Sequence, residues 1–214
     1  MLILEGIYED MGLLRLFNQT KKMAISYRGK RAMDLIVATM VLIVAWAPML
    51  VVAMLVKLTS RGAVLYWSDR VGRNNQLFRM PKFRTMQVDT PAVATHLLGK
   101  PEQYLTSIGG FLRKSSLDEL PQIWSILAGD MSLVGPRPAL FNQDDLIALR
   151  TEQGVHRLVP GLTGWAQING RDELPIPQKV ALDVVYMQKI SWSLDMLIMA
   201  RTAFKVLKRD GVTH

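Results

Sequence analysis

The sequence contains no cysteine, and this absence excludes disulfides, thiolate zinc sites, iron–sulfur clusters and cysteine nucleophiles. Histidine is scarce too. His96, His156 and His214 are scattered, and no two have the spacing of metal ligands, so we expect ordinary surface or core residues. The chain also lacks a glycine-rich phosphate loop, a dinucleotide-binding turn, an H-E-x-x-H motif, a G-x-S-x-G motif and a D-x-D carboxylate pair. The parts of most common nucleotide-dependent and hydrolytic enzymes are therefore missing.

Apolar and basic residues, by contrast, are abundant. Half of the 214 residues are hydrophobic, and the formal net charge is +8. A soluble domain of this size is usually more polar, which indicates a contribution from a membrane. The positive charge suits nucleic acid, an anionic membrane surface or phosphorylated substrates, and composition does not choose among the three.

One apolar run is long enough to suggest a membrane segment. Residues 35–56 contain no charged side chain. A straight helix of that length would be about 33 Å long, against about 30 Å for the hydrocarbon core of a bilayer. The run starts too far into the chain, and is too long, to be the apolar part of a secretory signal.

Pro48 interrupts this run slightly past its middle. It has no N–H to donate and its ring clashes with the carbonyl of Val44, so a kink is the minimum consequence. The limbs 35–47 and 49–56 are each too short to cross. Basic residues, which prefer the cytoplasmic side, flank both ends: Lys21, Lys22, Arg28, Lys30 and Arg31 before the run, and Lys57, Arg61, Arg70 and Arg73 after it. A re-entrant hairpin keeps both clusters inside and is favoured over the alternative, a kinked single-pass helix.

The remaining segments predict an α+β fold that is mostly α. Short strands are expected at 64–67 and 77–80, and helices at 123–127, 144–152, 176–188 and 193–209. We divide the chain into three parts: an amphipathic lead-in over 1–29, a re-entrant membrane helix over 30–59 and a domain at the membrane interface over 60–214.

The clearest chemical signal is a pair of adjacent carboxylates, Asp118 and Glu119, in the motif SLDELPQ. The spacing from Ser116 to Glu119 also fits a helix capping box, and acidic residues favour helix N-termini. Pro121 would then fall at the fifth helical position, whereas with Asp118 as the N-cap it lies in the first turn. On local sequence, a capping role and a chemical role therefore both stay open.

Three further segments carry residue types that bind phosphates or sugars. Arg137 lies between two prolines, which hold its guanidinium as a preset fork for a phosphate. Lys82 and Arg84 share one face if their segment is a strand, and would form a two-cation clamp. The loop at 160–171 combines glycines, an aromatic and polar side chains suited to a sugar or base pocket, among them Gln167, Asn169 and Arg171. A solvated turn, strand face or structural loop explains each segment about equally well.

Taken in order, these pieces resemble the bacterial sugar transferase family, the monotopic phosphoglycosyl transferases. The similarity covers roughly residue 30 to the C-terminus, and the ordered set is highly specific although any one motif could arise by chance. The matching motifs are KRxxD at 30–34, the central Pro48, KFRTM at 82–86, SLDELPQ at 116–122, GDMSLVGPRP at 129–138, PGLTGWAQINGR at 160–171, LDVVY at 182–186 and the closing KVLKRDGV.

The resemblance implies a helix–break–helix hairpin in the cytoplasmic leaflet of the bacterial inner membrane. Its hairpin residues would be Lys30, Arg31, Asp34 and Pro48. Many members of the family have serine before the central proline, where the hydroxyl can cap a freed carbonyl, and this chain has Ala47 there.

For the chemistry, the resemblance implies that Asp118 is the nucleophile, that Glu119 assists it and that Mg²⁺ is bound beside Asp118. Arg137, and less firmly Lys82 and Arg84, would handle phosphates. Asp118 would attack the sugar-linked phosphate of a UDP-sugar and release UMP, and polyprenyl phosphate (undecaprenyl phosphate) would then take the phospho-sugar. An N-acetylated 6-deoxy-hexosamine is the favoured sugar.

Other readings compete with this one. A basic, membrane-anchored module for nucleic acid or anionic lipid would use Asp118 only as a helix cap. A single-pass protein with an inactive domain is weaker, because every motif residue is intact. The transferase reading expects a UDP-sugar, polyprenyl phosphate and membrane lipids as partners, retains a second copy of the chain as a candidate partner, and expects no nucleic acid.

Overall fold

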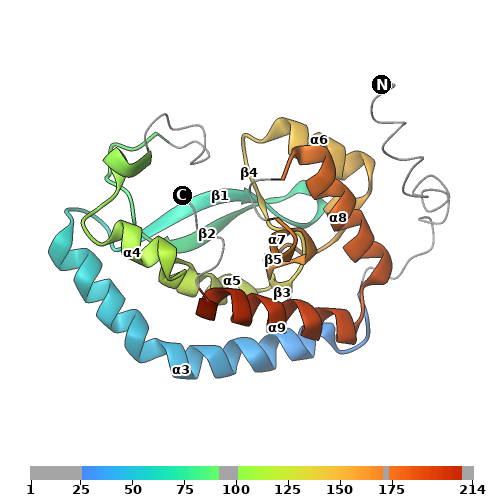
Figure 1. Ribbon diagram of the computed structural model, residues 1–214, viewed down its shortest axis with the longest axis horizontal. Coiled ribbons are helices and arrows are strands. Elements are labelled where there is room, and N and C mark those ends of the chain that lie inside the picture. Colours follow the sequence, from blue (N-terminus) through green and yellow to red (C-terminus); the bar gives the residue numbers. More distant parts are fainter. Residues whose placement is uncertain (1–25, 92–100, 171–173, 209–214) are drawn as a thin grey trace.

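The computed structural model describes residues 26–91, 101–170 and 174–208, so almost all of the lead-in over 1–29 lies outside the described part. The described chain is α+β and mostly helical, as predicted. One long helix, α3 (Lys30–Thr59), runs along the edge of a domain built from two short sheets and the remaining helices (Figure 1).

Helix α3 continues without interruption through Pro48. The missing N–H of Pro48 removes one hydrogen bond of the helix, and α3 changes direction part-way along its length instead of ending (Figure 1). The break predicted between two limbs is therefore not confirmed, and re-entrant insertion stays a prediction.

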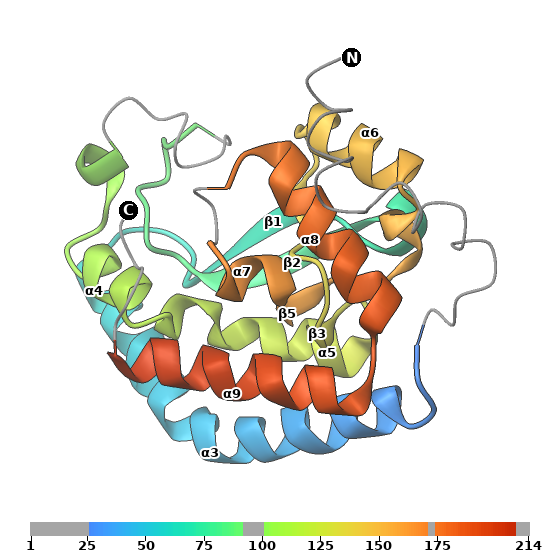
Figure 2. The same cartoon turned by 45° about the vertical axis from the view of Figure 1, so that its right-hand side comes forward.

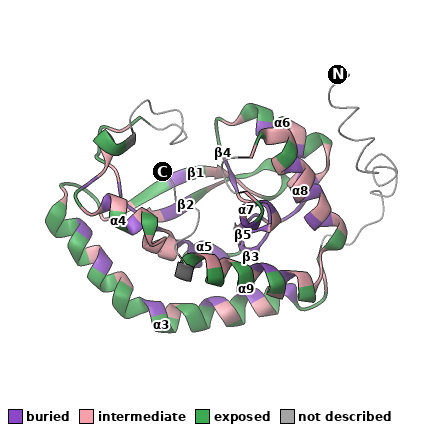
Figure 3. Cartoon of the chain, viewed as in Figure 1, coloured by how far each residue is buried: buried purple, intermediate pink, exposed green. Residues whose placement is uncertain are grey.

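The outer face of α3 is apolar and exposed. Its most apolar window of 18 residues has a mean hydropathy of 2.6, and only 17% of that window is buried inside the protein, so α3 has the length and composition of a membrane-crossing helix. The face that packs on the domain is narrow (Figure 3) and carries compact apolar residues: Ala38, Ala45, Val52 and Val56. Large apolar side chains cover the exposed face: Leu35, Ile36, Met40, Val41, Ile43, Val44, Trp46, Leu50, Val51, Met54, Leu55 and Leu58.

Two small sheets form the β part. Strand β1 (Leu65–Val71) pairs antiparallel with β2 (Leu77–Phe83) and with β4 (Ala139–Leu140), while β3 (Ser132–Val134) pairs parallel with β5 (Gly161–Thr163). The strands predicted at 64–67 and 77–80 are confirmed, although β1 and β2 each continue three or four residues further than predicted.

The four predicted helices of the domain are confirmed to within one residue at each end. Helix α4 (Gly109–Lys114) leads through a short 3-10 helix, η5 (Leu117–Gln122), into α5 (Ile123–Ala128). The later helices are α6 (Asp144–Glu152), α7 (Trp165–Ile168), α8 (Ile176–Lys189) and α9 (Trp192–Lys208). The confirmed helices are α5, α6, α8 and α9, whereas α4 and α7 were not predicted. In both Figure 1 and Figure 2, α9 runs alongside α3.

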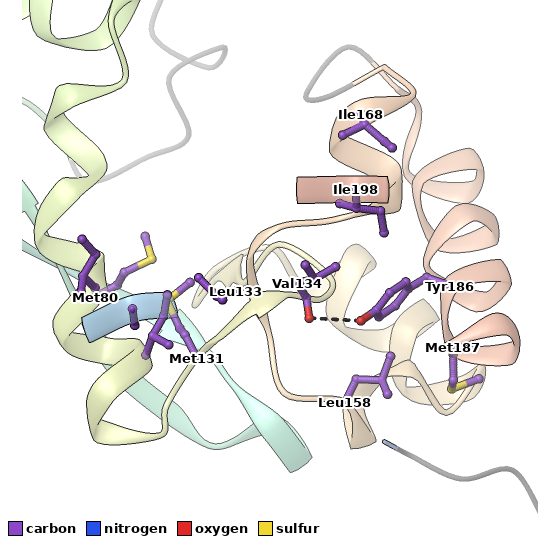
Figure 4. Close-up of a cluster of buried hydrophobic side chains, with 12 residues drawn as sticks. Met80, Met131, Leu133, Val134, Leu158, Ile168, Tyr186, Met187 and Ile198 are labelled. Carbon is purple, nitrogen blue, oxygen red and sulfur yellow. Dashed lines mark hydrogen bonds between the residues drawn. The ribbon is translucent and has the colours of Figure 1, made fainter. Parts of the chain in front are cut away.

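The main hydrophobic core joins α3 to the domain. Its buried members come from α3, β2, α5, β3, α7, α8, α9 and two loop positions: Ala38, Met80, Ile123, Ile126, Met131, Leu133, Val134, Leu158, Ile168, Tyr186, Met187 and Ile198. Tyr186 points from α8 toward β3, where its hydroxyl donates a hydrogen bond to the carbonyl of Val134 at 3.1 Å (Figure 4).

A buried ion pair fastens the start of α3 to α9. Asp195 is fully buried, and its Oδ2 lies 2.5 Å from Nζ of Lys30. The hydroxyls of Tyr186 and Tyr27 donate to the same carboxylate at 2.8 and 3.1 Å. A buried carboxylate is tolerable only when it is paired and hydrogen-bonded in this way.

Arg31 and Asp34 strengthen the same joint. The guanidinium of Arg31 donates to the carbonyls of Ile126 and Leu127 at 2.6 and 3.0 Å, near the C-terminal end of α5, where carbonyls lack helical partners. Oδ1 of Asp34 accepts from the backbone N–H of Leu133 at 3.1 Å. All three polar residues of KRxxD, which were predicted as hairpin residues, thus lie at the start of α3 and bind it to the domain.

Lys30→Met should lower the free energy of unfolding by about 3–5 kcal/mol, because it leaves the buried Asp195 carboxylate without its cation. Chemical denaturation in detergent micelles measures the change. Arg28→Met, at an exposed neighbour, is the matched control and should change stability by less than about 0.5 kcal/mol. Equal stability of the two variants would contradict the proposed importance of the ion pair.

Candidate active site

The two adjacent carboxylates lie in the short 3-10 helix η5. Before it, Ser116 has a left-handed backbone (φ 56°, ψ 16°), and its side chain caps nothing. This conformation is uncommon for a residue with a side chain and turns the chain sharply between α4 and η5. The capping box from Ser116 to Glu119 is therefore wrong, and Asp118 lies inside the 3-10 helix instead of capping it. Both carboxylates line one cavity.

Glu119 is held by two cations. Its Oε1 accepts hydrogen bonds from Nζ of Lys82 at 3.0 Å and from Nη2 of Arg137 at 2.6 Å. Burial by itself would raise the pKa of Glu119, but Arg137 and Lys82 outweigh that effect and hold the pKa well below its usual range. Glu119 is therefore ionised at neutral pH and orients both cations.

Asp118 differs from its neighbour in having free oxygens. Its side chain is largely buried, and within the described part of the chain no group donates a hydrogen bond to it. Burial raises the pKa of Asp118 to about 6, and Glu119 adds to the rise, although Lys82 and nearby arginines oppose it. The carboxylate is thus ionised at neutral pH, more basic than an ordinary aspartate and open to a ligand.

The cavity around these residues is large enough for a sizeable substrate. Its volume is about 1140 Å³, and β1, β2, η5, the loop before β4, α7, α9 and α3 are among the elements that line it. The cationic side chains near the carboxylates are Lys82, Arg113 and Arg137. They give this end of the cavity the charge that phosphate groups need.

Another arginine, Arg150, holds the backbone of the loop that carries Arg137. Arg150 of α6 donates from Nη1 to the carbonyl of Arg137 at 2.7 Å, and its Nη2 lies 2.6 Å from Oδ2 of Asp183 in α8. Arg70 of β1 likewise donates to the carbonyl of Pro138 at 3.2 Å. The flanking prolines and these two arginines together set where the Arg137 guanidinium lies.

Glycines allow this loop to pack closely on residues 161–164, which follow it in the chain. A Cβ at Gly161 would collide with the backbone nitrogen of Gly135, and a Cβ at Gly164 with the carbonyl of Gly135. The close approach permits the parallel pairing of β3 with β5. The glycines of the two motifs therefore build the frame of the site.

The motifs that meet at this cavity also match a known family along most of the chain. The sequence profile of the bacterial sugar transferases covers residues 25–209. The chain belongs to this family.

Individual relatives agree with the family assignment. An undecaprenyl-phosphate glucose phosphotransferase of Komagataeibacter xylinus is 42% identical over 85% of this chain and 35% of its own length. An undecaprenyl-phosphate galactose phosphotransferase of Salmonella typhimurium is 35% identical over 94% of this chain and 45% of its own. The sugar transferase EpsL of Bacillus subtilis, named as uncharacterized, is 39% identical over 86% of this chain and 89% of its own. The chain thus spans less than half of the first two relatives and most of the third.

Two other residues of this bacterial sugar transferase that were predicted to bind substrate, Arg84 and Gln167, line the cavity and are hydrogen-bonded within the protein. Arg84 lines the cavity but is buried, and its Nη2 donates to the carbonyl and the hydroxyl of Ser60 at 3.0 and 2.8 Å, at the end of α3. Gln167 lines the cavity and donates to the Leu162 carbonyl at 3.0 Å.

Of the last two predicted residues, one does not line the cavity and the other is not described by the structure. Asn169 is exposed and donates to the carbonyl of Trp165 at 2.7 Å, which completes the end of α7. Arg171 lies outside the described residues.

Sequence reasoning missed three residues that support the site, namely Arg113, Arg150 and Asp183. Arg113 and Arg150 stand in no motif, whereas Asp183 belongs to LDVVY and could have been singled out there. Arg113 donates to the hydroxyl of Thr85 at 3.0 Å and its charge favours the ionised form of Asp118.

A metal at this site would have few protein ligands. Among the described residues no three histidine, aspartate or glutamate side chains gather where they could hold an ion. Mg²⁺ suits such a place, because it keeps several waters and uses one or two carboxylates together with substrate phosphates. The open oxygens of Asp118 fit that role, while Glu119 is already paired with two cations.

If Asp118 acts as a nucleophile, kcat/KM should rise with pH through a midpoint near 6, because the carboxylate must be ionised and its pKa is raised to about 6. Glu119→Gln removes a negative charge and should move the midpoint to lower pH. Arg113→Met removes a positive charge and should move it to higher pH. A midpoint that stays in place in both variants would assign it to another group.

Arg150→Met should lower both stability, by about 3–5 kcal/mol, and turnover, because it leaves Asp183 buried without its cation and frees the Arg137 carbonyl. The double variant Arg150→Met/Asp183→Leu removes the unpaired charge and should regain most of the stability. Its turnover should stay about 10²-fold low, as expected for a displaced phosphate-binding group. Full turnover in the double variant would exclude a positioning role for Arg150.

Proposed function

We propose that the chain transfers a sugar-1-phosphate from a UDP-sugar to a polyprenyl phosphate through a covalent intermediate on Asp118. One observation carries the proposal. Asp118 presents free carboxylate oxygens in a cavity, beside a second carboxylate that is ionised and paired with two cations. The names of the relatives, which are glucose and galactose phosphotransferases acting on undecaprenyl phosphate, support the same reaction class.

The reaction has two displacements at one phosphorus. An oxygen of Asp118 attacks the phosphorus attached to the sugar, and the bond from that phosphorus to the bridging oxygen breaks, so UMP leaves. A phosphate oxygen of the polyprenyl phosphate then attacks the same phosphorus and releases the Asp118 carboxylate. The product is a polyprenyl diphosphate sugar. One site can serve a soluble donor and a lipid acceptor in turn by this route.

The neighbouring residues neutralise charge. Lys82 and Arg137 lie where they can contact the diphosphate, and Glu119 keeps both cations oriented before the donor binds. The low pKa of Glu119 makes it a weak base, so its assistance is electrostatic. When bound, Mg²⁺ would offset the diphosphate charge that repels a carboxylate nucleophile.

We further propose that the exposed face of α3 lies in the membrane and the domain on the cytoplasmic side of a bacterial inner membrane. The apolar composition of α3 and the basic residues at both of its ends support this placement. The favoured sugar remains an N-acetylated 6-deoxy-hexosamine. The reaction needs one copy of the chain, so a second copy as partner stays a prediction.

Purified protein should release UMP from at least one UDP-sugar when polyprenyl phosphate and Mg²⁺ are present, and Asp118→Asn should release none. The panel should contain UDP-glucose, UDP-galactose and N-acetylated 6-deoxy-hexosamine donors. Asp130→Asn, at an exposed aspartate outside the cavity, is the matched control and should retain wild-type activity. The donor that supports release also identifies the sugar.

Two results would count against the proposal. Turnover by Asp118→Asn at the wild-type rate would show that Asp118 is not the nucleophile. No release from any donor by folded wild-type protein would favour the basic binding module, which predicts strongly salt-dependent binding to anionic lipid or nucleic acid instead.

A further inference from the structure

The cavity that contains Asp118 has an apolar part walled by two helices. On one side are Val37, Ala38 and Val41 of α3, and on the other are Met199, Ala203 and Val206 of α9. We call these six residues the α3–α9 strip. Leu162 and Ile168 line the same cavity.

Three polar side chains beside the strip, those of Thr163, Thr202 and Lys205, are engaged within the protein. The hydroxyl of Thr202 donates to the carbonyl of Ile198 at 2.8 Å and lies 2.7 Å from the hydroxyl of Thr163. Nζ of Lys205 donates to the carbonyl of Ile168 at 2.7 Å. The strip therefore presents mainly apolar surface, which suits neither the sugar nor the uridine of a donor, because both need hydrogen-bonding partners.

The strip is continuous with the apolar outside of the molecule. Val41 lines the cavity and is also 40% exposed on the face of α3 that carries the large apolar side chains, and Val206 of α9 is 38% exposed. The cavity thus has a cationic end at Lys82, Arg113 and Arg137 and an apolar end that opens toward the exposed face of α3. An anionic head with a long apolar chain matches both ends.

We propose that the α3–α9 strip binds the isoprenoid chain of the lipid acceptor, next to its phosphate. The inference rests on the proposed function and adds a route for the lipid: the chain lies between α3 and α9 and leaves the cavity past Val41. The donor occupies the polar end in the first displacement, and the acceptor phosphate approaches the same phosphorus in the second.

The test separates the two displacements. Val41→Trp and Ala203→Trp narrow the strip from opposite sides, and Val44→Trp is the matched control, because Val44 is 78% exposed on the same helix and does not line the cavity. UMP release without acceptor, at most one equivalent per protein, reports the first displacement. The KM for undecaprenyl phosphate in the complete reaction reports binding of the acceptor.

We expect both strip variants to raise the acceptor KM by about tenfold or more, which corresponds to the loss of roughly two buried CH₂ groups. UMP release without acceptor should continue at the wild-type rate, and Val44→Trp should match wild type in both measurements. Two variants from separate helices keep the test valid if one of them fails to fold.

Three outcomes would overturn the inference. An unchanged acceptor KM in both strip variants would place the lipid chain elsewhere. Equal slowing of UMP release and of transfer would make the strip part of the donor site. An equal rise in KM for Val44→Trp would indicate a general effect of tryptophan in the membrane. Absence of UMP release from wild-type protein, in contrast, would refute the proposed function itself.

Discussion

The fold depends on one buried carboxylate. Asp195 of α9 is fully buried, and taking a carboxylate out of water is costly unless several donors compensate. Lys30, Tyr27 and Tyr186 do so, and they come from the start of α3, the residues before it and α8. Tyr186 also bonds the carbonyl of Val134, directly before the loop of Arg137. The attachment of the apolar helix and the placement of a phosphate-binding arginine therefore share one core.

The two adjacent carboxylates of the site, Asp118 and Glu119, differ in their pairing and in their pKa values. Burial alone would raise the pKa of both carboxylates, but Glu119 is paired with Lys82 and Arg137, which outweigh burial and lower its pKa. Asp118 keeps its oxygens free and has a raised pKa, while the pKa of Glu119 is lowered. Adjacent groups whose pKa values are pushed apart commonly take different roles in catalysis. The left-handed turn at Ser116 makes this division possible, because it turns both side chains toward the cavity instead of leaving them as helix caps.

Sequence motifs identified the residues near the proposed nucleophile better than they identified the residues that hold those side chains in place. Asp118, Glu119, Lys82 and Arg137 stand in recognisable patterns, and the structure brings all four to one cavity. Arg150 has no such pattern, because its role is defined by a carboxylate 33 residues further along the chain. Asn169, expected near the substrate, bonds the carbonyl four residues before it. A local polar motif can complete a helix end as readily as it can bind a ligand.

The sequence by itself determined what depends on local order: the apolar helix, the strands at 64–67 and 77–80, the adjacent carboxylates and the proline-flanked arginine. The tertiary structure alone decided that α3 continues through Pro48 and that KRxxD joins this helix to the domain. It also decided that Glu119, and not Asp118, is paired with two cations, and that the α3–α9 strip lines the same cavity. These properties arise from burial and from charge pairs, and both depend on groups that are distant in sequence and meet only when the chain is folded.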